Sequence, residues 1–215
     1  MHKKLINDVA DALLLIGPTG AGKTPLGDLF EQKGINGTRC LHFDFGSRLR
    51  SIAREGSPPK GFDRREHSFI RDVLEKGLLL EDEHFPIAEK IVLHFMEQKG
   101  YQEGDLLVLN GLPRHQGQAE DMKRLVTFRG LLVLDCAPED VLVRISGNSG
   151  GDRAGRPDDD IGLVRKKLEI FSERTEPLIR YFSSAGTGVV RLKVTADSSA
   201  SRIYEHFCAA ITAGR

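Results

Sequence analysis

The chain has 215 residues, enough for one domain with a substantial hydrophobic core. Its formal charge is +0, from 31 basic and 31 acidic residues, so no global field draws it to nucleic acid or to a membrane surface. Residues 1–8 are too polar for a secretory signal, and no apolar run reaches membrane-spanning length. We therefore expect a cytoplasmic monomer that binds small molecules and has neither nucleic acid nor membrane as a partner.

Three cysteines lie far apart in the chain, at positions 40, 136 and 208, and form no C-x-x-C pair. Because Cys40 and Cys136 fall in or beside apolar segments, we expect buried free thiols and neither a disulfide nor a cysteine metal site.

A phosphate-binding loop follows the first apolar run, residues 12–16. Residues 17–24 form a complete G-x-x-x-x-G-K-[ST] motif, and residues 25–30 can open the helix that the motif requires behind it. The backbone N–H groups of such a loop close around a polyphosphate, Lys23 reaches the outer phosphates and the Thr24 hydroxyl is placed to ligate Mg²⁺. The loop predicts binding of a nucleoside triphosphate, with contacts from Gly17, Thr19, Gly20, Ala21, Gly22, Lys23 and Thr24.

Five short apolar runs predict five strands, at residues 12–16, 40–43, 105–109, 130–135 and 189–194. The segments between them have helical periodicity, as in residues 88–96 and 160–182. Strands that alternate with helices imply right-handed βαβ units and a parallel sheet covered on both faces. We predict a single α/β domain over residues 1–215 with the three-layer P-loop NTPase fold and a five-stranded parallel sheet.

Two segments interrupt this alternation. Residues 46–83 are helical but lack a strand, and residues 147–157 are rich in glycine and carry two arginines. Each segment fits either a plain surface loop or a mobile cover over the carboxyl ends of the strands, where α/β sheets bind ligands. The two arginines favour a cover for residues 147–157.

Arginines recur at strand ends and helix starts: Arg50, Arg114, Arg144, Arg153, Arg156 and Arg165. Phosphoryl transfer asks for positive charge around the oxygens of the moving group, and the guanidinium fork meets phosphate bidentately. Arg114 is the strongest candidate, because a Gly-Leu-Pro-Arg turn at the end of a buried strand holds its side chain near the ligand edge of the sheet.

The chain resembles the adenylate kinases and related nucleoside monophosphate kinases from its first strand to its last helix. Five blocks carry the resemblance in the family's order: residues 17–24, 42–50, 77–83, 110–119 and the pair 143–147 with 156–168. The resemblance implies an acceptor-binding helical insertion at 46–83 and a short lid at 147–157.

The resemblance also implies roles for single residues. On the ATP side, Arg144 would stack on the adenine and Ala196 would lie against the base. On the acceptor side, Gln118 would read the base and the backbone near Leu78 would touch it. The implied acceptor residues are Gly46, Arg50, Leu78, Leu80, Gly111, Arg114, Gln118, Arg156 and Arg165, and the implied catalytic residues are Lys23, Arg114, Arg156 and Arg165.

Several positions depart from the family pattern. Phe45 and Ser47 stand where the family has threonine and aspartate beside the acceptor. Asn110 replaces a carboxylate that orders Mg²⁺-bound water, and Asn148 replaces a second lid arginine. Thr24 directly follows Lys23, where adenylate kinases place a glycine before the threonine.

Our leading hypothesis is a nucleoside monophosphate kinase that transfers the γ-phosphoryl group of Mg·ATP to AMP. Phe45 motivates an alternative, a P-loop kinase for a small non-nucleotide metabolite. Asn110 and Asn148 motivate a third, an ATP-binding regulator or degenerate kinase with little transfer activity.

Overall fold

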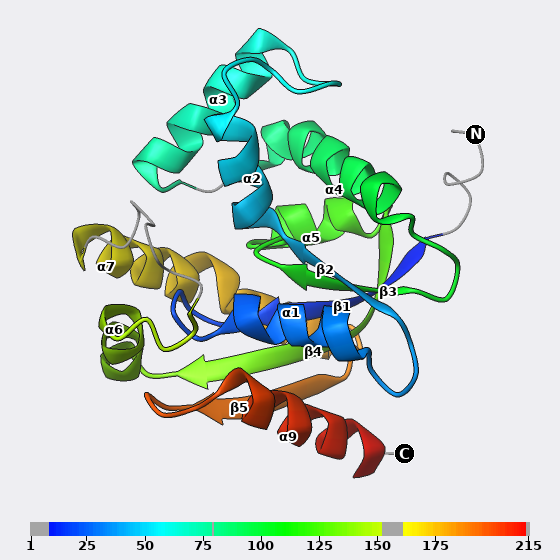
Figure 1. Cartoon of the computed structure of the whole chain (residues 1–215), viewed down its shortest axis with the longest axis vertical. Coiled ribbons are helices and arrows are strands. Elements are labelled where there is room, and N and C mark those ends of the chain that lie inside the picture. Colours follow the sequence, from blue (N-terminus) through cyan, green and yellow to red (C-terminus); the bar gives the residue numbers. More distant parts are fainter. Residues whose placement is uncertain (1–8, 79, 152–160, 214–215) are drawn as a thin grey trace.

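The computed structural model describes residues 9–78, 80–151 and 161–213. A parallel sheet of five strands, in the order β2-β3-β1-β4-β5, lies at its centre (Figure 1). The strands are β1 (Ala10–Ile16), β2 (Cys40–Asp44), β3 (Leu106–Asn110), β4 (Val126–Cys136) and β5 (Val189–Val194). All five predicted strands and their parallel arrangement are confirmed.

Strand β4 is longer than its apolar run predicts. It begins at Val126, and exposed Thr127 alternates with more buried neighbours in its first residues. These residues pair with β1 across an irregularity between Ala12 and Leu13. The sequence pattern missed them because only a continuous apolar run was read as a strand.

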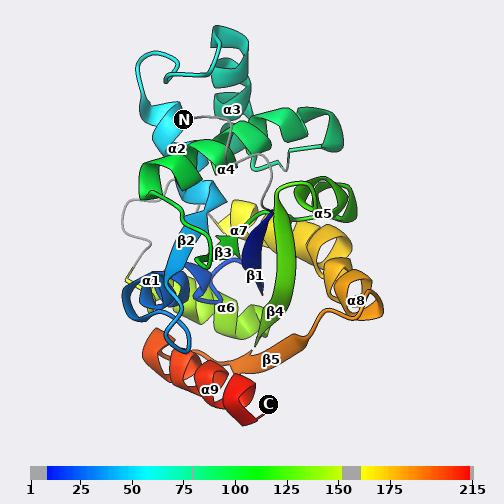
Figure 2. The ribbon, with the colours of Figure 1, turned by 90° about the vertical axis from the view of Figure 1, so that its right-hand side faces the viewer.

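Helices cover both faces of the sheet, as predicted (Figure 2). Along β1, Leu13 and Leu15 pack into one buried cluster with α1 (Lys23–Lys33) and α9 (Ala200–Ala213), while Leu14 and Ile16 pack into another. The second cluster includes residues of α4 (Phe85–Lys99), α5 (Gln116–Met122) and α8 (Pro177–Ser184). Alternate strand residues therefore build two cores on opposite faces, which makes the three layers.

The segment after β2 rises from the sheet as two helices, α2 (Phe45–Arg54) and α3 (Arg64–Lys76), followed by the short turn η1 (Asp82–His84) (Figure 1). Asp63 caps α3, because its carboxylate accepts from the amides of Arg65 and Glu66 and the Glu66 side chain accepts from the Asp63 amide. Gly77 ends the helix with a φ of 62°. The prediction of a helical segment without a strand is confirmed for the described part of 46–83.

The long helical stretch predicted at 160–182 is divided. It forms α7 (Ile161–Ile170), a π-helical turn η3 (Phe171–Thr175) and α8. The Glu176 amide donates to the Phe171 carbonyl at 2.8 Å, the wider hydrogen bond of a π turn, and Pro177 then opens α8. The remaining helix, α6 (Pro138–Ser146), follows β4.

Cys40 is buried, and Cys136 and Cys208 are partly buried. In the described part of the chain, no helix is both long and apolar enough to cross a membrane.

Candidate active site

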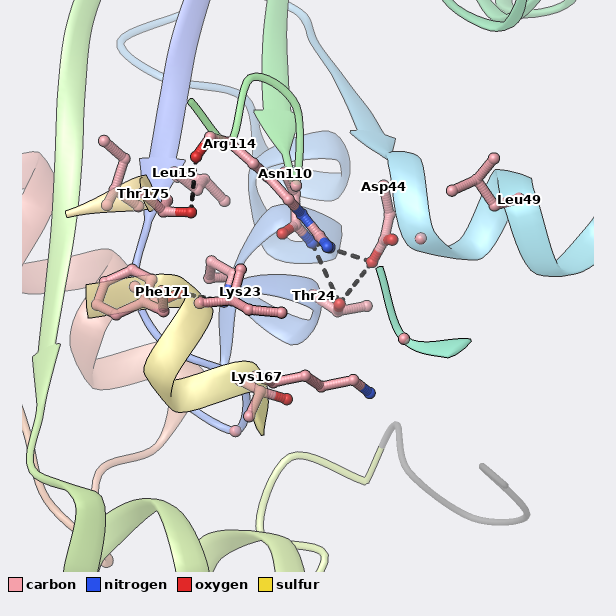
Figure 3. A pocket seen from close by; sticks show the side chains of 18 of the residues that line it. Leu15, Lys23, Thr24, Asp44, Leu49, Asn110, Arg114, Lys167, Phe171 and Thr175 are labelled. Atoms are coloured by element: carbon pink, nitrogen blue, oxygen red, sulfur yellow. Dashed lines mark hydrogen bonds between the residues drawn. The ribbon is translucent and has the colours of Figure 1, made fainter. Parts of the chain in front are cut away.

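A pocket opens at the carboxyl ends of β1, β2 and β3 (Figure 3). Its walls come from the loop of residues 17–24, from α2 and the end of α3, from the turn after β3, and from α7 and η3. Twelve of the predicted site residues line it: Gly17, Thr19, Gly20, Gly22, Lys23, Thr24, Gly46, Arg50, Leu78, Gly111, Arg114 and Arg144. The structure thus brings most of the predicted donor and acceptor residues to one cavity.

The loop of residues 17–24 has the backbone of a phosphate-binding loop. Gly20 and Gly22 have φ angles of 79° and 94°, which side-chain-bearing residues rarely adopt, and Gly22 caps α1. The Lys23 ammonium lies back over the loop and donates to the carbonyls of Gly17 at 2.6 Å and Pro18 at 2.7 Å. Ala21 is fully buried, so its side chain anchors the loop in the core and does not line the pocket.

Thr24 belongs to a triangle of side chains at the centre of the pocket (Figure 3). Its hydroxyl donates to Asp44 Oδ2 at 2.6 Å, and the Asn110 amide donates to Thr24 Oγ1 at 3.2 Å and to Asp44 Oδ2 at 3.0 Å. The triangle joins the helix after β1 to the ends of β2 and β3, where Asp44 and Asn110 are register partners.

Asp44 is a site residue that sequence reasoning missed. Partial burial would raise the pKa of its carboxyl group, but hydrogen bonds from the Thr24 hydroxyl and the Ser47 amide, together with the charges of His42 and Arg50, bring that pKa below its usual value. Asp44 is therefore an anion in the pocket. The sequence signal was an acidic residue at the last position of a buried strand.

Arg144 is 3% exposed and holds the donor side together. Its guanidinium donates to the Gly20 carbonyl at 3.0 Å and to the carbonyls of Thr195 and Ser198 at 2.9 and 2.8 Å. The loop after β5 is fixed further by the Ala196 amide, which donates to an Asp140 carboxylate oxygen at 2.8 Å. Arg144 thus ties the phosphate loop to the segment predicted to lie against the ATP base. Ala196 is half-buried beside the cavity and does not line it.

On the acceptor side, Arg50 and Arg114 approach glycines. A Cβ at Gly46 would come 3.2 Å from Arg50 Nη1, and a Cβ at Gly111, whose φ is 83°, would come 3.3 Å from Arg114 Nη2. The missing side chains leave room for the two guanidinium groups at the pocket wall. Leu78 lines the cavity and is 45% exposed.

Gln118 and Leu80 lie behind the pocket wall. Gln118 is buried, its amide oxygen accepts from the Arg114 amide at 2.8 Å and its amide nitrogen donates to the Leu80 carbonyl at 2.8 Å. His115 Nε2 donates to the same carbonyl at 2.9 Å. These bonds join the Gly-Leu-Pro-Arg turn to the segment after α3. Neither Gln118 nor Leu80 lines the cavity in this structure.

Arg165 does not line the pocket and lies on the exposed side of α7, whereas Lys167, to which no role was assigned from the sequence, lines it (Figure 3). Successive helical residues turn by about 100°, so residues two apart face different sides of a helix. The cationic side chain that α7 presents to the pocket is therefore Lys167. Arg156 lies outside the described residues, as does most of the predicted lid at 147–157.

Phe45, expected beside the acceptor, is 3% exposed in the core, where its ring lies 6.0 Å from that of Phe43. It does not line the pocket. The Phe45 side chain therefore offers neither a hydroxyl nor an apolar surface to the cavity.

The π-helical turn η3 also lines the cavity, beside the turn that carries Arg114. The Thr175 hydroxyl donates to the Arg114 carbonyl at 2.8 Å, and Phe171 lines the cavity near it (Figure 3).

The donor set fits Mg²⁺ bound together with a nucleotide. A hydroxyl and a carboxylate meet at Thr24, and such hard oxygen ligands suit Mg²⁺, which in nucleotide enzymes binds one or two protein groups plus substrate phosphates. No group of three or more His, Cys, Asp or Glu residues within the described ranges could hold a metal ion alone.

Comparison with known proteins finds a matching family model and several similar nucleotide kinases. A family model described as an AAA domain matches residues 13–162. The chain is 30% identical over 184 residues to the adenylate kinase of Thermus thermophilus, covering 83% of this chain and 87% of that protein. It is 27% identical over 200 residues to adenylate kinase isoenzyme 1 of Homo sapiens, covering 91% of each. It is 24% identical over 177 residues to UMP-CMP kinase 1 of Oryza sativa subsp. japonica, covering 81% of this chain and 64% of that protein.

Proposed function

The chain belongs to the adenylate kinase and nucleoside monophosphate kinase family of phosphotransferases, and from this premise we propose that it transfers the γ-phosphoryl group of Mg·ATP to AMP. One observation carries the proposal: a single cavity holds both the phosphate loop with Lys23 and, on the facing wall, Arg50 and Arg114. A donor triphosphate and an acceptor monophosphate bound at these groups would meet with their phosphates between them.

The residues around the cavity supply positioning and positive charge, which is most of what phosphoryl transfer requires. The loop amides and Lys23 hold the outer phosphates of the donor, and Thr24 would ligate Mg²⁺, which offsets the charge of the β- and γ-oxygens when it is bound. Arg50 and Arg114 bind the acceptor phosphate. Lys167 lines the same cavity and would stabilise the charge on the transferring group.

The choice of AMP rests on the acceptor wall. Residues 77–83 and 110–119 resemble the family's base-binding blocks, and hydrogen bonds from His115 and Gln118 to Leu80 join the two blocks. Relatives named adenylate kinase support the same acceptor. Gln118 would read the base after exchanging its bond to Leu80 for one to the adenine.

A coupled assay with ATP and a panel of AMP, CMP, UMP, GMP and dTMP tests the proposal. We expect AMP to give the highest kcat/KM. Arg50→Ala should raise the KM for the acceptor, because it removes a phosphate ligand from the wall. Arg54→Ala is the matched control, since it removes the same charge from the exposed end of the same helix.

A higher kcat/KM with CMP or UMP would show that AMP is not the preferred acceptor, while the protein would still be a nucleoside monophosphate kinase. No turnover with any monophosphate, in a protein that binds ATP, would contradict the proposal and favour an ATP-binding regulator.

A further inference from the structure

The end of β2 carries a carboxylate that the family resemblance does not assign. Asp44 faces Thr24 in the cavity and accepts its hydroxyl hydrogen at 2.6 Å. A hydroxyl has one hydrogen and two lone pairs. Donation to Asp44 turns the hydrogen of Thr24 towards the carboxylate, and Asn110 occupies one lone pair, so the valence of the oxygen leaves a second lone pair for a cation.

The neighbours of Asn110 explain why an amide stands at this position. Asp28 Oδ1 lies 2.9 Å from His42 Nδ1, and because a carboxylate can only accept, Nδ1 carries the hydrogen of that bond. Asn110 Nδ2 lies 3.0 Å from Asp44 Oδ2, 3.2 Å from Thr24 Oγ1 and 3.5 Å from His42 Nε2.

The two nearest neighbours of the Asn110 amide nitrogen, Asp44 Oδ2 and Thr24 Oγ1, both accept from it, so position 110 must supply a donor. An aspartate there would place a second carboxylate beside Asp44, and like charges at such a distance do not both ionise readily. The site beside Thr24 therefore accommodates one carboxylate, at position 44 or at position 110. In this chain it is at position 44.

We propose that Asp44 is the carboxylate that orders the water shell of the nucleotide-bound Mg²⁺, and that Asn110 acts as the donor that holds Asp44 and Thr24 in place. The proposal deepens the proposed function, since it assumes a Mg·ATP donor, but it does not depend on the identity of the acceptor. The family pattern has a carboxylate at the end of β3, where this chain has Asn110. In this chain the negative charge lies instead at the end of β2, on Asp44.

Titration of Mg²⁺ into the full-length protein with a fluorescent ATP analogue, in the absence of any acceptor, tests the proposal without measuring turnover. The readout is the Mg²⁺ concentration at which half of the gain in nucleotide affinity is reached. Asp44→Asn should raise that concentration by about tenfold or more, the loss typical of removing a group that orients the ligands of a metal. Asparagine also caps helices well, so α2 keeps its N-terminal cap.

The double variant Asp44→Asn with Asn110→Asp returns one carboxylate to the triangle from the neighbouring strand. We expect it to recover most of the Mg²⁺ response. Asp135→Asn is the matched control, because it removes the same charge from the carboxyl end of β4, where Asp135 pairs with Arg191 at 2.8 Å on the surface. It should leave the titration unchanged.

An unchanged Mg²⁺ response in Asp44→Asn would overturn the proposal. Loss without recovery in the double variant would overturn it as well, because the carboxylate would then act by holding Thr24 and not by its charge. Failure of the AMP assay has a different signature: the Mg²⁺ titration would behave as expected while no monophosphate is phosphorylated.

Discussion

The donor and acceptor sides of the cavity are held together by different kinds of contact. On the donor side, Arg144 is buried against backbone carbonyls, and Thr24, Asp44 and Asn110 bond to one another. On the acceptor side, contacts between elements include exposed pairs: Lys90 with Glu66 at 2.6 Å, and Arg174 with Glu81 at 2.7 Å.

Buried, fully bonded polar groups are rigid because each lost bond leaves a group without water, whereas exposed ion pairs contribute little. From this comparison we predict that the donor side is preformed, while the helical segment from α2 to η1, which exposed pairs join to its neighbours, adjusts around an acceptor. The following changes test that difference.

The largest effect is expected from the donor side. Lys23→Met should lower kcat/KM by about 10² to 10³, because one preorganised cation is lost at the oxygens where charge develops. The rise in melting temperature on adding ATP should shrink with it. Lys33→Met, in the exposed last turn of the same helix, is the control and should stay near wild type. Normal activity in Lys23→Met would contradict a preformed donor site.

A smaller catalytic effect is expected on α7. Lys167→Ala should reduce kcat/KM by about tenfold, a change of about 1.4 kcal/mol in the barrier, because this lysine faces the cavity. Arg165→Ala removes the same charge from the exposed side of the helix and should change kcat/KM by less than about twofold, within about 0.4 kcal/mol. The reverse order in a steady-state assay would restore Arg165 as the cation of the site.

Gly27 tests how tightly the donor side is packed. A Cβ at Gly27 would overlap the buried His42 ring, which is hydrogen-bonded to Asp28. Alanine usually stabilises a helix relative to glycine, but here overpacking should lower the free energy of unfolding by about 1–3 kcal/mol in urea titrations.

Gly117→Ala is the matched control for Gly27→Ala. A Cβ at Gly117 would overlap the Asp82 carboxylate, whose side chain is 64% exposed and is able to swing away. We expect a change within about 0.5 kcal/mol. In addition, Gly27→Ala should not lower the free energy of unfolding further in a His42→Ala background. If it lowers that free energy there by the same amount as in the wild type, the His42 ring is not what the added methyl group overlaps.

The smallest effect is expected for the ion pair between Arg174 of η3 and Glu81 on the acceptor side. The hydrogen bond from Arg174 holds the pKa of Glu81 below the usual glutamate value of 4.5. A lowered pKa in the folded state means that the pair stabilises the fold above pH 4.5 and that this contribution is lost as the pH falls through the lowered value.

Glu81→Gln should therefore reduce stability at pH 7 by at most about 1 kcal/mol, because the pair is exposed, and the difference from wild type should shrink as the pH falls below 4.5. Urea midpoints across a pH series measure it. A difference that stays constant as the pH falls would assign the effect to packing.

Local patterns in the sequence determined much of this protein. The motif at residues 17–24 encodes a backbone shape in consecutive residues, and the apolar runs mark strands buried on both faces, so the loop, the sheet and its parallel arrangement were predictable. The position of Arg50 and Arg114 at the cavity was also predictable, because each arginine follows a strand that ends at the ligand-binding edge of the sheet.

Only the tertiary structure decided which side chains meet at that edge. Asp44 and Asn110 are 66 positions apart and become neighbours through the register of β2 on β3. The helical period separates Arg165 from Lys167, but the packing of α7 selects Lys167 for the cavity. Such pairings depend on how distant elements pack, and a local pattern carries no information about that packing.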